Sequence, residues 1–290
     1  MTTTISPAGR LRAILDEPGI EVMPGCFDAL SARLIERAGF RVTFMGGFAV
    51  AAARLAMPDT GLISYGEMVD QGRDICAGVK IPVIGDADTG YGNALNVKRT
   101  VAGYARAGFA CAMIEDQVAP KRCGHTRGKE VVARAEALAR LRAAVDARDD
   151  GADILIMGRT DARATDGLDE ALWRARAFAD LGADLVFVEA PLGEDEMRRL
   201  CREIPAPTMA NMVEGGDTPV LPAPRLEEIG YKLALYPLTL LSTAVRAMEE
   251  ALAALKSGRR PTRLKDFAAL RQLVGFDAYG EAETRYAVSD

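Results

Sequence analysis

The sequence contains a single histidine, His125, in 290 residues. Zinc sites that use two or three histidines are therefore excluded. A catalytic arrangement of the Ser-His-Asp or Cys-His kind would have to use this one imidazole.

Cysteines and long apolar runs are also scarce. The five cysteines are odd in number and show no CxxC spacing, and the first residues lack the apolar core of a secretory signal. We therefore expect free thiols in a cytoplasmic protein. The longest apolar run, residues 231–245, is interrupted by Lys232 and Pro237. It is shorter than the roughly 20 helical residues that cross a bilayer, so we expect no membrane association.

Positive charge is in short supply as well. Lysine and arginine total 36 against 41 aspartates and glutamates, which gives a net charge of −5. Such a chain has no basic field for a phosphate backbone, so nucleic acid is not an expected partner. Small anionic substrates remain compatible with this charge, because a few arginines in a pocket can reverse the local potential.

Short apolar runs alternate with segments of helical period along nearly the whole chain. Eight of these runs are expected strands, at residues 21–24, 42–45, 83–86, 112–115, 154–158, 185–189, 208–211 and 233–236. Most are apolar at consecutive positions, as parallel strands covered on both faces are. Eight βα units without a Gly/Ser linker predict an α/β fold, a (β/α)8 TIM barrel. A doubly wound sheet is the alternative, which the absence of a G-x-G-x-x-G after the first strand disfavours.

The helical segments complete the expected organisation. Residues 28–38 predict a helix that turns Leu30, Leu34, Ile35 and Ala38 to the core. Further helices are expected at 240–256 and 264–286. The chain is thus predicted to be one barrel domain over residues 1–290, with 257–290 as a C-terminal helical extension. Such an extension often packs on a neighbouring subunit, so we expect an oligomer.

Acidic residues follow two neighbouring strands of the predicted barrel. Asp86 and Asp88 follow the third strand, and Glu115 ends the fourth. The carboxyl ends of barrel strands meet at one face, where active sites lie. Three carboxylates without a nearby histidine suit Mg²⁺, or Mn²⁺, held partly through water. Ordinary helix-capping acids are the alternative interpretation for Asp86 and Asp88.

The segment after the fourth strand, residues 117–129, combines lysines and arginines with Cys123 and the only histidine. A solvated basic loop and a buried cysteine are the ordinary interpretations of such a segment. However, a thiol flanked by Arg122, Gly124 and His125 lies in an electropositive setting that lowers a thiol pKa. Gly124 and Gly128 would let the loop close over a bound anion.

Several strings of the sequence occur in the order and spacing of the isocitrate lyase/phosphoenolpyruvate mutase superfamily, which the chain resembles over nearly its whole length. They are PGCFDALSARL, FMGG, PDTG, GDADTGYG, EDQVAPKRCGH, GRTDA, VEAP and NMVEGGDTP. The string KRCGH at residues 121–125 resembles the carbon–carbon lyase branch in particular. That branch includes methylisocitrate lyases, 2,3-dimethylmalate lyases and related 2-alkylmalate lyases.

The resemblance implies a barrel that exchanges its last helix between subunits, commonly in a homotetramer. It implies Mg²⁺ at Asp86, Asp88 and Glu115. The implied substrate-binding residues are Met45, Gly46, Gly47, Asp59, Lys121, Gly124, Arg159, Asn211 and Pro237, and the implied catalytic residues are Cys123, His125 and Glu189. The implied reaction cleaves a 2-hydroxy di- or tricarboxylate into a 2-oxo acid and a carboxylic acid. Cys123 would be the general acid that protonates the departing carbanion.

Two departures from the family pattern bear on the substrate. Ser242 stands where methylisocitrate lyases have an arginine for a third carboxylate, although Arg271 matches their other late arginine. Pro237 stands where oxaloacetate-hydrolysing relatives tend to have serine. The resemblance therefore favours 2,3-dimethylmalate or another 2-alkylmalate. Methylisocitrate lyase is the first alternative, followed by oxaloacetate hydrolase or phosphonate mutase, and then by a metabolite-binding barrel without catalysis.

Overall fold

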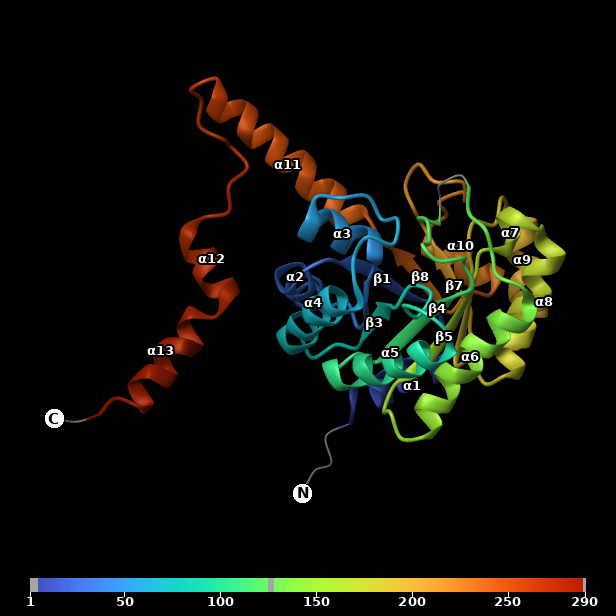
Figure 1. The fold of residues 1–290 in the computed structure, drawn as a ribbon. Coiled ribbons are helices and arrows are strands. Elements are labelled where there is room, and N and C mark those ends of the chain that lie inside the picture. The colour runs from blue at the N-terminus through green and yellow to red at the C-terminus, as the bar shows by residue number, and fades with distance from the viewer. Residues whose placement is uncertain (1–4, 125–127, 289–290) are drawn as a thin grey trace. The chain divides into compact units, whose positions relative to one another are not determined.

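Eight parallel strands form the centre of the protein in the computed structural model, which describes residues 5–124 and 128–288 (Figure 1). Their order is β6-β5-β4-β3-β2-β1-β8-β7, and every paired neighbour is parallel. A parallel bridge between Val186 and Thr208 joins the two ends of this order. The strands are β1 (Glu21–Cys26), β2 (Thr43–Met45), β3 (Val83–Asp86), β4 (Cys111–Glu115), β5 (Leu155–Thr160), β6 (Leu185–Val188), β7 (Met209–Asn211) and β8 (Leu233–Tyr236). The predicted (β/α)8 barrel is confirmed.

Helices connect consecutive strands around the outside of this barrel (Figure 1). The connecting helices are α2 (Ala29–Arg37), α3 (Gly47–Leu55), α4 (Tyr65–Gly78), α5 (Ala94–Ala107), α6 (Arg134–Asp149), α7 (Ala162–Thr165), α8 (Leu168–Asp180), α9 (Glu194–Glu203) and α10 (Ala223–Ile229). In the sequence, α1 (Pro7–Asp16) precedes β1, and α11 (Thr239–Lys256), α12 (Phe267–Val274) and α13 (Phe276–Arg285) follow β8. Local signals set their ends: α5 begins at an Asn93–Asn96 capping box and ends at the left-handed Gly108.

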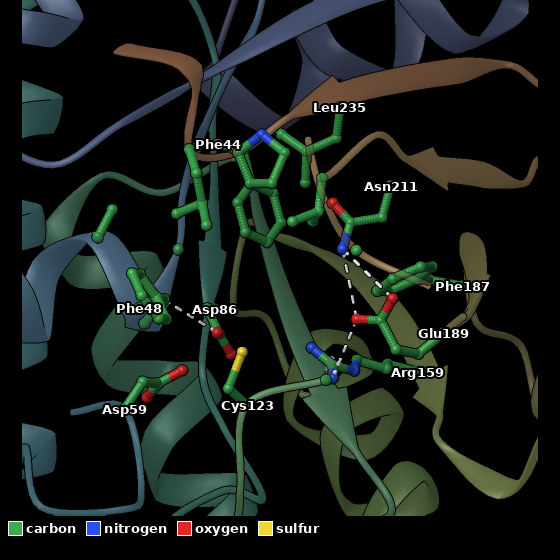
Figure 2. Close-up of a pocket in the computed structure, with 18 of the residues that line it drawn as sticks. Phe44, Phe48, Asp59, Asp86, Cys123, Arg159, Phe187, Glu189, Asn211 and Leu235 are labelled. Carbon is green, nitrogen blue, oxygen red and sulfur yellow. Dashed lines mark hydrogen bonds and ion pairs between the residues drawn. The ribbon is translucent and has the colours of Figure 1, made fainter. Parts of the chain in front are cut away.

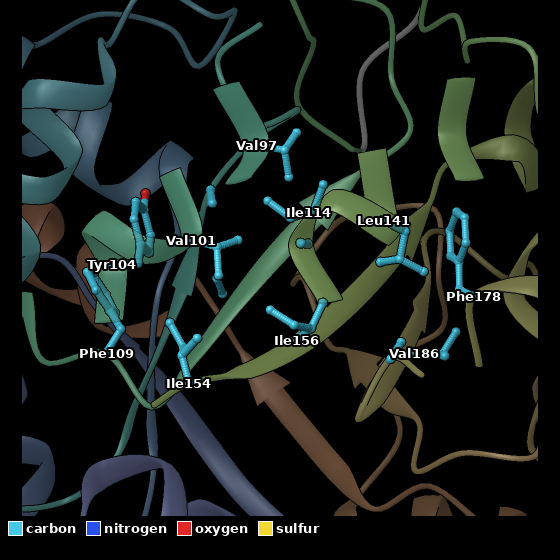
Figure 3. Close-up of a cluster of buried hydrophobic side chains, with 14 of the residues drawn as sticks. Val97, Val101, Tyr104, Phe109, Ile114, Leu141, Ile154, Ile156, Phe178 and Val186 are labelled. Carbon is cyan, nitrogen blue, oxygen red and sulfur yellow. The ribbon is translucent and has the colours of Figure 1, made fainter. Parts of the chain in front are cut away.

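Three hydrophobic clusters hold the barrel together, one inside it and two between its strands and the surrounding helices. Inside it, alternate strand residues such as Met113 and Met157 pack in one cluster with Leu11 of α1. The residues between them, such as Ile114 and Ile156, face outward and pack against the helices (Figure 3). This inner cluster also contains the first residues of several strands, such as Leu155 and Leu185. Because Leu11 belongs to the same cluster, α1 covers the amino-terminal end of the barrel. The carboxyl-terminal end is left for the site.

The chain divides into two compact units, Met1–Leu241 and Ser242–Asp290. Within the second unit, Leu273 is the one buried residue among those described. Its last two helices were expected as one segment, but Gly275, with φ of 90°, separates α12 from α13. The organisation as one domain with an extension over 257–290 stays a prediction.

The predicted core face of α2 is partly wrong. Of the four residues predicted to face the core, only Ile35 is buried: Leu30 and Leu34 are 46% and 43% exposed, and Ala38 is exposed too. The helix instead buries Ser31, Ala32 and Ile35, because the Ser31 side chain belongs to the capping box with Asp28 at the start of the helix. Among the residues described, no helix is both long and apolar enough to span a membrane.

Candidate active site

The polar residues of the site continue the inward-facing rows of the barrel. Side chains of a strand alternate between its two faces, so a residue two positions beyond an interior one also faces inward. Interior hydrophobic residues precede six site residues by two positions, in the pairs Ile84 and Asp86, Met113 and Glu115, Met157 and Arg159, Phe187 and Glu189, Met209 and Asn211, and Leu235 and Pro237. The five strands β3 to β7 therefore pass from apolar core to polar site at their carboxyl ends.

These strand ends surround a cavity of about 270 Å³ (Figure 2). Eleven residues predicted from the sequence line it: Gly46, Gly47, Asp59, Asp86, Lys121, Cys123, Gly124, Arg159, Glu189, Asn211 and Pro237. Asp88 and Glu115 are buried behind this lining. The Met45 side chain packs outside the barrel with the helix layer and does not line the cavity. His125 lies outside the described residues.

Arg159, Glu189 and Asn211 form a connected cluster on one wall of the cavity (Figure 2). Arg159 Nη2 lies 3.2 Å from Glu189 Oε2, and Asn211 Nδ2 donates to the same carboxylate at 3.3 Å. Behind Arg159, the carboxylate of Asp161 accepts from Nε at 2.8 Å and from Nη2 at 3.2 Å. The guanidinium also lies 5.3 Å from the ring centre of Phe187. These contacts fix a cation whose planar edge suits a carboxylate.

An acidic cluster forms the opposite wall. The ammonium of Lys121 lies 2.7 Å from Asp59 Oδ1 and 3.0 Å from Asp88 Oδ1. Asp86 accepts from the backbone N–H groups of Gly47 at 3.1 Å and of Asp88 at 3.0 Å. A Cβ added to Gly47 would lie 3.0 Å from Asp86 Oδ2. Glycine at this position thus lets the start of α3 approach the carboxylates closely.

Burial strongly affects the charge of this acidic wall. It raises the pKa of Asp88 to about 7, against the opposing effect of Lys121. It also raises the pKa of Glu115 well above its usual range, although Arg159 opposes the shift. Burial lowers the pKa of Lys121, but the surrounding carboxylates outweigh this effect, and the net result is a pKa well above the usual value. The wall is therefore short of positive charge.

We tested whether a divalent metal fits this wall. Among the described residues, no three Cys, His, Asp or Glu side chains lie close enough together to hold an ion on their own. However, both carboxylate oxygens of Glu115 are buried without a hydrogen bond in the described part of the chain, where only Oε2 has an ion pair, at 3.2 Å from Arg159 Nε. Lys121 places a cation between two other carboxylates. Buried oxygens need a partner. The donor set fits a Mg²⁺ ion that keeps several of its waters, and it does not fit a closed protein cage.

Cys123 enters the cavity from the segment between β4 and α6 (Figure 2). The segment begins and ends in a short antiparallel bridge between Gln117 and Val131. Next to the thiol, Gly124 packs so closely that an added Cβ would lie 2.2 Å from Glu189 Oε2. The predicted lowering of the Cys123 pKa stays a prediction.

Sequence reasoning missed the apolar part of the cavity wall. This part consists of Phe44, Phe48, Met113, Phe187, Val213, Leu235 and Leu238. A signal for four of them was present in the sequence: Phe44, Met113, Phe187 and Leu235 each belong to a strand and stand two positions before a predicted site residue. Phe48, Val213 and Leu238 lie outside the strands, where no such period applies.

The chain matches a known protein family over most of its length. The pattern of the phosphoenolpyruvate phosphomutase family matches residues 11–256. The chain belongs to the phosphoenolpyruvate mutase/isocitrate lyase superfamily. The family resemblance that the motifs indicated is confirmed.

Members of this superfamily match the chain over most of its length. The 2,3-dimethylmalate lyase of Eubacterium barkeri is 43% identical over 287 residues, covering 98% of this chain and 99% of that enzyme. The 2-methylisocitrate lyase of Aeropyrum pernix is 41% identical over 242 residues, covering 83% and 77%. The structure of oxaloacetate acetylhydrolase with 3,3-difluorooxalacetate aligns with a TM-score of 0.93 at 33% identity, covering 97% of each chain. The two relatives compared by sequence are lyases, the enzyme class that the motifs predicted.

Proposed function

We propose that this protein is a Mg²⁺-dependent carbon–carbon lyase that cleaves 2,3-dimethylmalate, or another 2-alkylmalate, into a 2-oxo acid and a carboxylic acid. The observation that carries the proposal is one cavity that contains the acidic wall, the Arg159–Glu189–Asn211 cluster and the Cys123 thiol. The identity of 43% with a 2,3-dimethylmalate lyase over nearly the whole of both chains supports the substrate class.

The binding half of the mechanism follows from the charges of the cavity. Arg159 holds the carboxylate of the half that becomes the 2-oxo acid, with the N–H groups that follow Gly47 at the start of α3 on the opposite side, since the Gly47 N–H itself donates to Asp86. Asp86, Asp88 and Glu115 are the residues that would hold the metal, which supplies charge stabilisation for the oxygens of this half. Asn211 keeps the Glu189 carboxylate oriented toward the substrate hydroxyl.

The chemical half uses two proton carriers of the chain. Glu189 accepts the proton of the C2 hydroxyl, and the C2–C3 bond breaks as C2 becomes a carbonyl carbon. The electron pair of that bond passes to C3 and its carboxylate, and Cys123 donates a proton to C3. Solvent returns the proton to the thiol and removes it from Glu189. No net redox change occurs.

The apolar wall supports an alkylated substrate. Phe187, Leu235 and Pro237 line the cavity, and none of them carries a side-chain hydrogen-bond donor. Such a surface stabilises methyl groups by burying them, at about 0.8 kcal/mol for each CH₂. Pro237 has no hydroxyl that could hydrogen-bond to the hydrated oxo group of oxaloacetate, whereas the serine that oxaloacetate-hydrolysing relatives tend to have at this position does. This composition favours a 2-alkylmalate over oxaloacetate.

A substrate panel tests the proposal. Release of 2-oxo acid is measured with Mg²⁺ for 2,3-dimethylmalate, 2-ethylmalate, 2-methylisocitrate and oxaloacetate. We expect the highest kcat/KM with one of the two alkylmalates. A preference for 2-methylisocitrate would refute the 2-alkylmalate assignment and would indicate a 2-methylisocitrate lyase instead. Conversion of phosphoenolpyruvate to phosphonopyruvate would overturn the lyase assignment.

A variant tests the role of the thiol. Cys123→Ser is expected to lose cleavage while it retains Mg²⁺-dependent binding of oxalate, which resembles the 2-oxo acid half and needs no proton. Unchanged turnover in Cys123→Ser would refute the general-acid role. Oxalate binding that does not depend on Mg²⁺, together with no turnover of any substrate, would indicate a metabolite-binding barrel.

We also propose that the chain forms a cytoplasmic homotetramer that exchanges its C-terminal helices. Met248, Leu252 and Leu255 of α11 are 56%, 65% and 61% exposed. Exposure of such apolar side chains to water is unfavourable, and a neighbouring subunit would cover them. No disulfide joins any of the five cysteines in the described part of the chain, which supports a reducing compartment. Light scattering after size exclusion should give the mass of four chains, and the mass of one chain would refute the assembly.

A further inference from the structure

Two side chains hold the backbone on either side of Cys123. Gln117 donates from Nε2 to the carbonyl oxygen of Arg122 at 2.9 Å, and its Oε1 accepts from the N–H of Arg122 at 2.9 Å. Lys129 donates from Nζ to the carbonyl oxygen of Gly124. The residue before the thiol and the residue after it are thus each bound by a side chain from an end of the same segment.

Both of these residues are anchored, Gln117 by a residue of α6 and Lys129 by a residue that follows β5. Gln117 is buried, and its carbonyl oxygen accepts from Arg140 Nη1 at 2.8 Å. The Lys129 ammonium forms a second contact of 2.8 Å with Asp161 Oδ1, and the two side chains are 4% and 0% exposed. Asp161 also holds Arg159. The position of the thiol is therefore tied through Lys129 to the carboxylate that orients the substrate-binding arginine.

We propose that Gln117 and Lys129 are positioning residues that hold Cys123 at the distance and angle needed to protonate the departing carbon. A cysteine side chain has a single rotatable bond before its sulfur, so the backbone at residues 122–124 determines where the thiol lies. Neither residue lines the cavity beside Arg159. This inference rests on the proposed function, since it assigns a purpose to the geometry of its general acid.

The proposal predicts a separation of kcat from binding. Lys129→Met and Gln117→Met keep the approximate size of each side chain and remove its donors. A misplacement of about 1 Å costs about 100-fold in rate, so each variant should lose about 100-fold in kcat, with KM and Mg²⁺-dependent oxalate affinity within threefold of wild type. Lys129→Arg, which keeps donors for both oxygens, should lose less. The double variant should lose about as much as either single variant, because both act through one thiol.

A second measurement does not depend on turnover. Alkylation of Cys123 by iodoacetamide, followed by mass spectrometry of its peptide, should become several-fold faster in both methionine variants. Glu130→Gln is the matched control: its side chain is exposed, it neighbours Lys129, and it should leave kcat and alkylation unchanged. Melting temperatures near that of wild type show that the variants are folded.

The possible outcomes are distinct. Unchanged kcat and unchanged alkylation in both methionine variants would overturn the proposal. An equal fall in kcat and in oxalate affinity would also overturn it, since Lys129 would then act on Arg159. If no panel substrate is cleaved by the wild type while alkylation still accelerates in the variants, the proposed function fails and the positioning of Cys123 by Gln117 and Lys129 stands.

Discussion

Gly124 permits a sharp prediction because it follows Cys123 directly and packs against the cluster of Arg159, Glu189 and Asn211. An added Cβ would lie 2.2 Å from Glu189 Oε2 and 2.7 Å from Arg159 Nη2. Neither atom belongs to a freely moving side chain, since the two groups pair with each other at 3.2 Å and both residues are buried. The backbone of Gly124 is outside the left-handed region, so alanine adds only this steric conflict.

The size of the effect follows from these distances. Ordinary contact with a Cβ begins at 3.4 Å, so Glu189 and the segment that carries Cys123 must separate by more than 1 Å in Gly124→Ala. Misplacement of about 1 Å costs about 100-fold in rate. We expect kcat to fall by about that factor. Oxalate affinity should fall as well, because Arg159 is displaced, whereas Lys129→Met should leave it unchanged.

The assay compares turnover of the best panel substrate with oxalate calorimetry and thermal unfolding. Gly66→Ala is the control, since its added Cβ would meet only Ser64 Oγ within 4 Å, at 3.9 Å. That variant should keep wild-type kcat. If Gly124→Ala turns over within threefold of wild type, the close approach of the segment to Glu189 is not the catalytic geometry.

Three further predictions concern charge. Hydrogen bonds from Arg134 and Arg174 lower the pKa of Glu170 to about 2, so the ionised carboxylate stabilises the fold fully above its ordinary pKa near 4.5, and this stabilisation disappears as the pH falls through 2. The difference in Tm between wild type and Glu170→Gln should therefore shrink between these pH values, and a constant difference would contradict the prediction. Arg174→Met leaves the buried Asp116 without its ion pair of 3.0 Å and should lower the free energy of unfolding by about 3–5 kcal/mol in guanidinium titrations, whereas a loss below about 1 kcal/mol would refute this reasoning. Removal of divalent metal with EDTA should abolish turnover and weaken oxalate binding. Addition of Mg²⁺ at 100 times its Kd should raise the free energy of unfolding by about 2.7 kcal/mol, so an unchanged Tm on Mg²⁺ addition would count against a metal site.

The sequence predicted the barrel well because its strands have a strong physical signature. Strands covered on both faces are apolar throughout. Residues such as Ile84 and Ile156 are buried, and their neighbours along the strand are buried as well, so apolar and polar residues do not alternate. The polar residues that interrupt these runs at their carboxyl ends were therefore conspicuous. Asp86 and Glu115 could be predicted as site residues for this reason, independently of the family resemblance, whereas Arg159 was assigned through that resemblance.

Features that depend on contacts between distant segments could not be predicted. The burial of Ser31 in place of Leu30 follows from a cap that competes with hydrophobic periodicity. The roles of Gln117 and Lys129 depend on which carbonyl oxygens their side chains reach, and spacing carries no information about that. The apolar wall is contributed partly by connecting segments, where no period applies.

The balance of buried charge explains why binding of metal and of substrate should be linked. Around the cavity, the described residues place six buried carboxyl groups against three buried cations: Asp59, Asp86, Asp88, Glu115, Asp161 and Glu189 against Lys121, Lys129 and Arg159. The raised pKa values of Asp88 and Glu115 reduce the negative charge, but the remaining four carboxylates still outnumber the cations. A dicarboxylate would add two negative charges to this excess. Coulomb repulsion in a buried site far exceeds its value in water, so a substrate of this charge needs a compensating cation before it can enter. A site with this surplus is therefore suited to an anionic substrate only when a divalent ion offsets part of the negative charge, and the same surplus that raises the pKa of Lys121 would favour binding of that ion.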